Sequence, residues 1–216
     1  MNITFPLGAA VAGLLAATSA YGETTATAWT DLNLRAGPGT TYAITSVIPA
    51  AETVSVEGCL DASNWCRVNH GGIDGWASGD YLTAMVDNAE VPIYANRERV
   101  QIATVTYEDS GETAALTGAS GALAGALVGG PVGALVGAVV GIGAGAMAAP
   151  DDRVVTYVRT NPVEPLYLDG EIVVGAGIPE TVTLAEVPDS DYYYTNINGV
   201  PVIVQREDRR VIHIIR

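Results

Sequence analysis

Residues 31–40 read DLNLRAGPGT, and this stretch decides how the first part of the chain folds. Leu32 and Leu34 alternate with polar residues, so both leucines point to the same, inward side of an extended backbone. The Gly-Pro-Gly sequence at residues 37–39 is typical of a tight turn. Further along, Gly75 precedes Trp76 and leaves room for the indole ring to close a small barrel. The pattern therefore predicts β structure around a small apolar interior.

Short β segments separated by turns are expected on both sides of this stretch. Alternation of polar and apolar residues in TVSV, residues 53–56, indicates a half-buried strand. Turn-forming residues bound each of the other segments. The expected strands cover residues 25–30, 44–48, 53–58, 65–69 and 75–77.

Residues 31–40, together with GWASGDYL at residues 75–82, resemble the two signature ends of the bacterial SH3-like domain. The resemblance implies an SH3-like small β-barrel over residues 24–84 that binds peptidoglycan or an envelope protein. Aromatic rings beside polar loops supply contact area with little loss of entropy, so they are the candidate ligand contacts. Packing of the barrel is the alternative for each ring. The candidate ligand-binding residues are Tyr42, Trp65 and Tyr81.

The chain has two cysteines, Cys59 and Cys66, separated by a polar turn. They can face each other across a β-hairpin, and in an oxidising compartment we expect a disulfide. A redox-active pair is the alternative, but the spacing is not that of a Cys-x-x-Cys motif.

A long uncharged run extends over residues 113–150, and glycine recurs in it at every fourth position. Residues four apart lie above one another on an α-helix, so the glycines form a ridge along which a second helix can approach closely. The Gly-Gly-Pro sequence at residues 129–131 suits the end of one helix and the start of the next. The run therefore predicts a helical hairpin. The packing glycines are Gly121, Gly125, Gly129, Gly133, Gly137, Gly141 and Gly145.

The glycine run resembles the glycine-zipper segments of Gram-negative envelope proteins, which implies membrane association or self-association. Each arm is slightly short for a bilayer, so the hairpin would insert as a thin or tilted element. Acidic residues precede and follow the run, as expected if both ends lie on the outer side of the membrane. A hairpin that packs on itself in water and a flexible Gly/Ala linker are the alternatives.

The N-terminus reads as a secretory signal over residues 1–20, with an apolar core and small residues at its end. It lacks a Lys or Arg before the apolar core, so an uncleaved anchor is the alternative. The signal places the protein in the periplasm or cell envelope of a Gram-negative bacterium.

The chain contains no lysine and carries a formal net charge of −14, which disfavours binding to nucleic acid through phosphates. Weak binding of divalent cations is an alternative reading of this acidity. The two histidines, His70 and His213, lie in no recognisable nucleophile or metal motif, so we expect no enzyme, no cofactor and no metal site.

Residues 85–112 are expected to form a polar linker, and residues 152–216 a β-rich domain. Asn198-Gly199 is a strong hairpin signal, and a second turn at residues 206–209 makes the last three strands a meander. The three consecutive tyrosines at residues 192–194 should place alternate rings on opposite faces of the sheet. The expected strands are residues 154–159, 166–168, 172–174, 182–187, 192–197, 201–205 and 210–215.

The segments NPVEP at residues 161–165 and VGAGIP at residues 174–179 resemble an uncharacterised family of Gram-negative periplasmic proteins. That resemblance implies location and architecture but no activity. The predicted fold is mainly β, with an SH3-like barrel, a central glycine-zipper hairpin and a C-terminal β-rich domain. We expect a non-enzymatic envelope binding or scaffold protein; the alternative is a structural or membrane-perturbing oligomer formed by the glycine run without a specific ligand.

Overall fold

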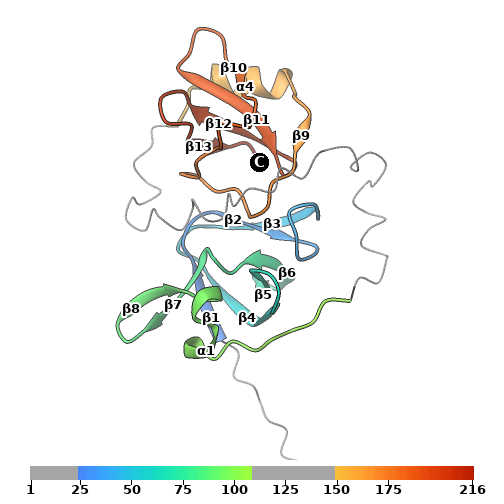
Figure 1. Cartoon of the computed structure of the whole chain (residues 1–216), viewed down its shortest axis with the longest axis vertical. Coiled ribbons are helices and arrows are strands. Elements are labelled where there is room, and N and C mark those ends of the chain that lie inside the picture. Colours follow the sequence, from blue (N-terminus) through green and yellow to red (C-terminus); the bar gives the residue numbers. More distant parts are fainter. Residues whose placement is uncertain (1–23, 109–148) are drawn as a thin grey trace, which may run out of the picture.

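The computed structural model describes residues 24–108 and 149–216. The predicted signal and the packing glycines lie outside the described residues. Of the predicted hairpin only Ala149 and Pro150 are described, and neither has regular secondary structure. Figure 1 shows the described residues as two stacked regions, called here the N-terminal domain (residues 24–108) and the C-terminal domain (residues 149–216).

The N-terminal domain is built on one eight-stranded sheet with the order β3-β2-β6-β5-β4-β1-β7-β8. Each of the five strands expected in this domain is present, and the SH3-like β fold is consistent with the sheet. Leu32, Leu34, Val54, Val56 and Val68 fill its interior and are at most 3% exposed. The strands are β1 (Thr24–Ala28), β2 (Leu32–Arg35), β3 (Ile44–Ile48), β4 (Thr53–Cys59), β5 (Trp65–His70), β6 (Ile73–Ser78), β7 (Leu82–Val86) and β8 (Ala89–Pro92).

The first part of the segment expected as a polar linker carries regular secondary structure, and its strand β8 belongs to the sheet of this domain. Strands β7 and β8 form a hairpin whose turn residues Asp87 and Asn88 have φ values of 51° and 65°. Asp and Asn tolerate the left-handed conformation that such a tight turn needs, so the pair closes a hairpin without glycine. The 3-10 helix η1 (Tyr94–Asn96) and the short helix α1 (Arg97–Val100) follow.

The C-terminal domain begins with a helix where a strand was expected over residues 154–159. Helix α4 (Asp152–Thr160) is capped by Asp151, whose side chain accepts a hydrogen bond from the backbone N–H of Val154. Val154 and Val158 are both buried and lie four residues apart, so they share one face of the helix. The valine-rich sequence was misread because capping and helical spacing outweigh the preference of valine for strands.

A five-stranded sheet follows, with the order β10-β11-β12-β13 and with β9 paired to β11. The predicted meander of the last three strands is confirmed. The turn residues Asn198 and Gly199 have φ values of 54° and 84°, as the hairpin signal requires. The strands are β9 (Pro165–Leu166), β10 (Ala185–Glu186), β11 (Tyr192–Ile197), β12 (Val200–Gln205) and β13 (Val211–Ile214).

The strands expected over residues 172–174 and over most of residues 182–187 are absent. In the loop between these two segments and at Val182, the Arg209 guanidinium donates hydrogen bonds to the carbonyl oxygens of Ile178, Pro179 and Val182. The same loop also bonds through its backbone to residues 209–211, where Gly177 forms an isolated bridge with Arg210.

The two faces of the C-terminal sheet have different neighbours. On one face, Tyr194 and Ile203 pack with Val158 of helix α4. The other face contributes to an apolar cluster that also contains residues of the N-terminal domain. Tyr193 packs against that second cluster, so adjacent tyrosines do face opposite sides. No helix within residues 24–108 and 149–216 is long and apolar enough to cross a membrane.

Candidate ligand-binding site at the domain seam

Strand β2 presents polar side chains to the C-terminal domain. Leu32 and Leu34 point into the N-terminal domain, while Asn33 and Arg35 lie on the opposite face of the strand. That face would be exposed to water in an isolated domain, yet Asn33 and Arg35 are 0% and 1% exposed. Figure 1 shows β2 and β3 directly beneath the C-terminal domain. We call this contact the seam.

Glu171 of the C-terminal domain binds these two side chains. Its carboxylate accepts two hydrogen bonds from the Arg35 guanidinium, at 2.5 Å and 2.8 Å, and one from the Asn33 amide at 3.0 Å. The backbone N–H of Ile172 supplies a further donor at 3.1 Å. Both charged side chains are at most 1% exposed, and their buried charges are paired in a bidentate geometry. The seam is therefore a specific contact with fixed register.

Arg35 also organises the turn that follows β2. Its Nη1 donates to the carbonyl oxygens of Thr40 and Tyr42, at 3.0 Å and 2.8 Å. The hydroxyl of Thr40 then donates to the carbonyl oxygen of Leu168 across the seam at 3.1 Å. One guanidinium thus links the turn at residues 37–42 to the loop that carries Glu171.

The turn between β11 and β12 fixes the loop around Leu168 through the side chain of Asn198. The Asn198 side chain accepts from the backbone N–H of Leu168 and donates to the carbonyl oxygen of Gly170. Asn198 is 2% exposed, so these bonds are shielded from water. At the C-terminus, Arg216 donates to the side-chain oxygen of Asn33 at 3.1 Å.

A cavity of about 270 Å³ opens where the turn at residues 37–42 meets this loop. Trp65 forms part of its wall and is itself 5% exposed. Asp169 is the one charged residue in the lining, so the cavity favours a neutral or cationic group over an anion. The lining residues are Pro38, Gly39, Thr40, Thr41, Ser63, Trp65, Tyr167, Leu168, Asp169 and Gly170.

The three predicted contact residues lie in three different surroundings. Trp65 lines the cavity. Tyr42 is half-buried, with its ring against Gly37 and Gly39 and in an edge contact with Tyr107. The structure therefore does not bring the three aromatic residues together in one groove.

Tyr81 is buried in the seam. Its hydroxyl donates to the carbonyl oxygen of Glu171 at 3.4 Å, and its ring is 5% exposed. Burial, followed by the charges of Asp80 and Glu171, raises the pKa of the Tyr81 phenol. The phenol stays protonated and serves as a donor across the seam. Tyr81 was predicted to contact an external ligand, but in the structure it contacts the C-terminal domain instead.

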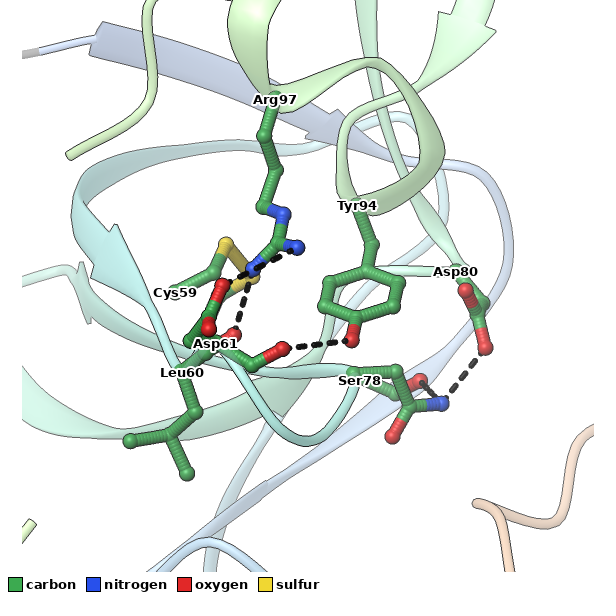
Figure 2. The surroundings of a disulfide bond; sticks show 9 residues. Cys59, Leu60, Asp61, Ser78, Asp80, Tyr94 and Arg97 are labelled. Carbon is green, nitrogen blue, oxygen red and sulfur yellow. Dashed lines mark hydrogen bonds and ion pairs between the residues drawn. A yellow bond between two sulfur atoms is a disulfide. The ribbon is translucent and has the colours of Figure 1, made fainter. Parts of the chain in front are cut away.

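The predicted disulfide between Cys59 and Cys66 is present and joins β4 to β5 (Figure 2). Arg97 of helix α1 donates to the carbonyl oxygen of Leu60, next to the disulfide, at 2.7 Å. Tyr94 donates to the carbonyl oxygen of Asp61 in the same turn at 3.5 Å. The segment after β8 therefore packs on the disulfide hairpin, and a disulfide is compatible with a secreted or envelope protein.

Neither histidine lies in a metal-binding cluster, because residues 24–108 and 149–216 contain no group of three or more side chains suited to hold a metal ion. His70 pairs with Glu52 at 2.7 Å in the N-terminal domain. In β13, burial and the charges of Arg216 and Arg159 lower the pKa of His213, which keeps its imidazole neutral at pH 7.

Two parts of the chain match known protein families. Residues 30–83 match the model of the bacterial SH3 domain, and residues 157–216 match a domain of unknown function, DUF1236. A bacterial SH3 domain suggests a binding or scaffold role. A comparison with curated proteins found no match for the chain.

Sequence reasoning missed the residues that build the seam. Arg35 and Asn33 gave a usable signal, because they alternate with the inward-facing leucines and so occupy one face of the strand. Glu171 gave none, since one glutamate in an acidic chain looks like ordinary surface. The pairing depends on contacts between residues more than a hundred positions apart, which local patterns do not report.

Proposed function

We propose that this protein is a non-enzymatic binding or scaffold protein of the bacterial cell envelope. Its bacterial SH3 domain would hold peptidoglycan or an envelope protein in the seam cavity beside Trp65. The observation that carries the proposal is this cavity, which combines an aromatic wall with loop backbone and the carboxylate of Asp169. Such a lining suits a peptide or glycopeptide with an uncharged or amino-bearing group.

The C-terminal domain has a role in this proposal. Residues 167–170 supply one side of the cavity, and residues 38–41 of the turn after β2 supply another. The ligand site would therefore be complete only when both domains are docked.

Sedimentation of the full chain with purified peptidoglycan sacculi tests the proposal. Thr41 is exposed and lines the cavity, so Thr41→Trp should fill the opening without disturbing the core. Thr183→Trp is the matched control, because Thr183 is an exposed threonine outside the cavity lining. We expect wild type and Thr183→Trp to sediment with sacculi and Thr41→Trp to stay in the supernatant. If Thr41→Trp sediments as well as Thr183→Trp, the cavity is not the binding site. If the wild type stays in the supernatant, peptidoglycan is not the ligand.

The glycine run supplies the second part of the proposal, namely membrane association or self-association. Its four-residue glycine register supports a close helix contact. Alkaline carbonate extraction of envelopes from producing cells tests membrane insertion: retention in the pellet supports it, and release into the wash refutes it.

The second candidate function is a structural or membrane-perturbing oligomer with no specific ligand, which the same glycine register favours. Replacing Gly125 and Gly137 by Leu should then abolish the oligomer in light scattering, because the added side chains would separate the helices. An unchanged mass distribution would eliminate this function.

A further inference from the structure

The segment at residues 102–108 lies across the N-terminal domain and bonds to β4 through its backbone. The N–H of Cys59 donates to the carbonyl oxygen of Ala103 at 2.9 Å, and the N–H of Val105 donates to the carbonyl oxygen of Cys59 at 3.0 Å. Residue Thr104 forms a parallel bridge with Cys59. Both backbone polar groups of Cys59 are therefore used by this segment, in the manner of a peptide added to a sheet.

The register of β4 makes room for this contact. Among the residues that the structure describes, strand β1 pairs with β4 from Thr53 to Val56, and the pairing of β4 with β5 shifts between Val56 and Gly58. Beyond that irregularity no described residue of β1 pairs with β4, and Cys59 bonds the 102–108 segment through its backbone. Irregularities of this kind commonly mark places where a strand changes its partners.

The absence of a side chain at Gly58 allows the 102–108 segment to approach β4 closely. A Cβ atom built at Gly58 would lie 2.6 Å from the carbonyl oxygen of Ala103 and 2.6 Å from Cγ1 of Val105. Its three nearest neighbours all belong to the 102–108 segment. The missing side chain at residue 58 thus serves the docking of the segment.

Near the end of the segment, the ring of Tyr107 packs against two aromatic side chains of the domain, Tyr42 and Trp76. Its ring makes edge contacts with Tyr42 at 5.9 Å and with Trp76 at 5.5 Å between ring centroids. Its hydroxyl is buried, and the structure gives it no hydrogen-bond partner among the described residues. Tyr42 and Trp76 therefore form a good contact surface for an aromatic ring, but the site offers no hydrogen-bond partner among the described residues for a tyrosine hydroxyl.

We infer that Gly58, Cys59, Tyr42 and Trp76 form a peptide-binding surface, which residues 102–108 occupy within the chain. The surface accepts an extended peptide that places a carbonyl, an N–H and an aromatic ring at alternate residues, as Ala103, Val105 and Tyr107 do. Main-chain bonds hold the peptide and the ring gives it specificity. This surface is separate from the seam cavity and does not depend on the function proposed for it.

The internal segment competes with any external peptide. A tethered segment acts at an effective concentration of the order of mM, so an external peptide binds weakly until the segment leaves. Val105→Pro removes the N–H that bonds Cys59, and Tyr107→Ala removes the ring. The double variant vacates the surface without altering any residue that forms it.

A fluorescently labelled peptide of residues 101–108 is the probe, and its anisotropy is measured with the full chain. We expect binding to the Val105→Pro/Tyr107→Ala chain to be at least about tenfold tighter than to wild type, because the internal competitor is gone. Adding Gly58→Ala to that double variant should abolish binding. Adding Gly177→Ala should not, since a Cβ built at Gly177 meets nothing within 4 Å. A folded double variant that does not bind the peptide would overturn the inference.

Hydrogen exchange of the wild-type chain gives a second test that needs no variant. If residues 102–108 occupy the surface reversibly, the Val105 amide should exchange by local opening, at least about tenfold faster than the amide of Val68 in the core of the sheet. Equal exchange rates at the two amides would mean that the segment leaves only when the domain unfolds, and would overturn the inference.

Discussion

Within the described residues, the β sheet of the N-terminal domain is contacted by the C-terminal domain at the seam and by its own final segment at residues 102–108, and these two contacts are built differently. At the seam, the Glu171 carboxylate has four hydrogen-bond donors within 3.1 Å and both charged side chains are buried. At the 102–108 segment, two backbone hydrogen bonds and one ring hold the contact, and the Tyr107 hydroxyl lacks a partner among the described residues. The difference indicates a permanent contact at the seam and an exchangeable one at the segment.

Breaking the seam should have the largest effect. Glu171→Ala leaves the Arg35 guanidinium buried without its counter-ion, and the loss of one member of a buried pair costs about 3–5 kcal/mol. We expect the free energy of unfolding in urea to fall by that amount. The double variant Arg35→Met/Glu171→Leu is the control, because it removes both charges together and should restore most of the stability. A loss below about 1 kcal/mol for Glu171→Ala would mean that the seam is an exchangeable contact too.

Removing the disulfide weakens the hairpin on which the 102–108 segment docks. The short loop between Cys59 and Cys66 gives an expected stabilisation of about 2.5 kcal/mol in the chain-entropy model. Cys59→Ala/Cys66→Ala should lower the free energy of unfolding by that amount, and reduction of the wild-type chain should lower it similarly. A variant as stable as wild type would show that the hairpin is held by its packing alone.

Removing the unpartnered hydroxyl of Tyr107 should strengthen the weaker contact. A buried polar group without a partner is unfavourable, so Tyr107→Phe should raise the free energy of unfolding by up to about 1 kcal/mol. The matched control is Tyr94→Phe, in which the lost hydroxyl donates to the carbonyl oxygen of Asp61. That variant should be neutral or slightly destabilised. Destabilisation by Tyr107→Phe would show that the hydroxyl has a partner.

Lowering the pH should slightly reduce the stability of the fold through protonation of His213 in the C-terminal sheet. Because folding lowers the pKa of His213, the unfolded chain binds more protons near its ordinary value of 6.5, and stability falls as the pH drops below that value. The measurement is the urea midpoint at pH 7.5 and at pH 5.5 for wild type and for His213→Gln. The wild type should lose more stability between the two pH values than the variant, and equal losses would refute the assignment.

Local patterns predicted the parts of the fold that local physics decides. The Asn198-Gly199 turn and the strands on either side of it followed from backbone preference and alternation. The disulfide followed from two cysteines across a short turn. Helix α4 was missed because the Asp151 cap and the spacing of Val154 and Val158 outweighed strand preference. Trp65 was predicted as a ligand contact and lines the cavity, whereas Tyr81 lies in the seam.

The sequence by itself determined the two β regions, the closing hairpin and the disulfide, since each depends on residues close together along the chain. Only the tertiary structure decided that Arg35 meets Glu171, that Tyr81 bonds across the seam, and that Tyr107 contacts both Tyr42 and Trp76. Alternation along β2 indicates which side chains share a face but not what covers that face. The partner is chosen by long-range shape and charge complementarity, which appears only when the domains are packed together.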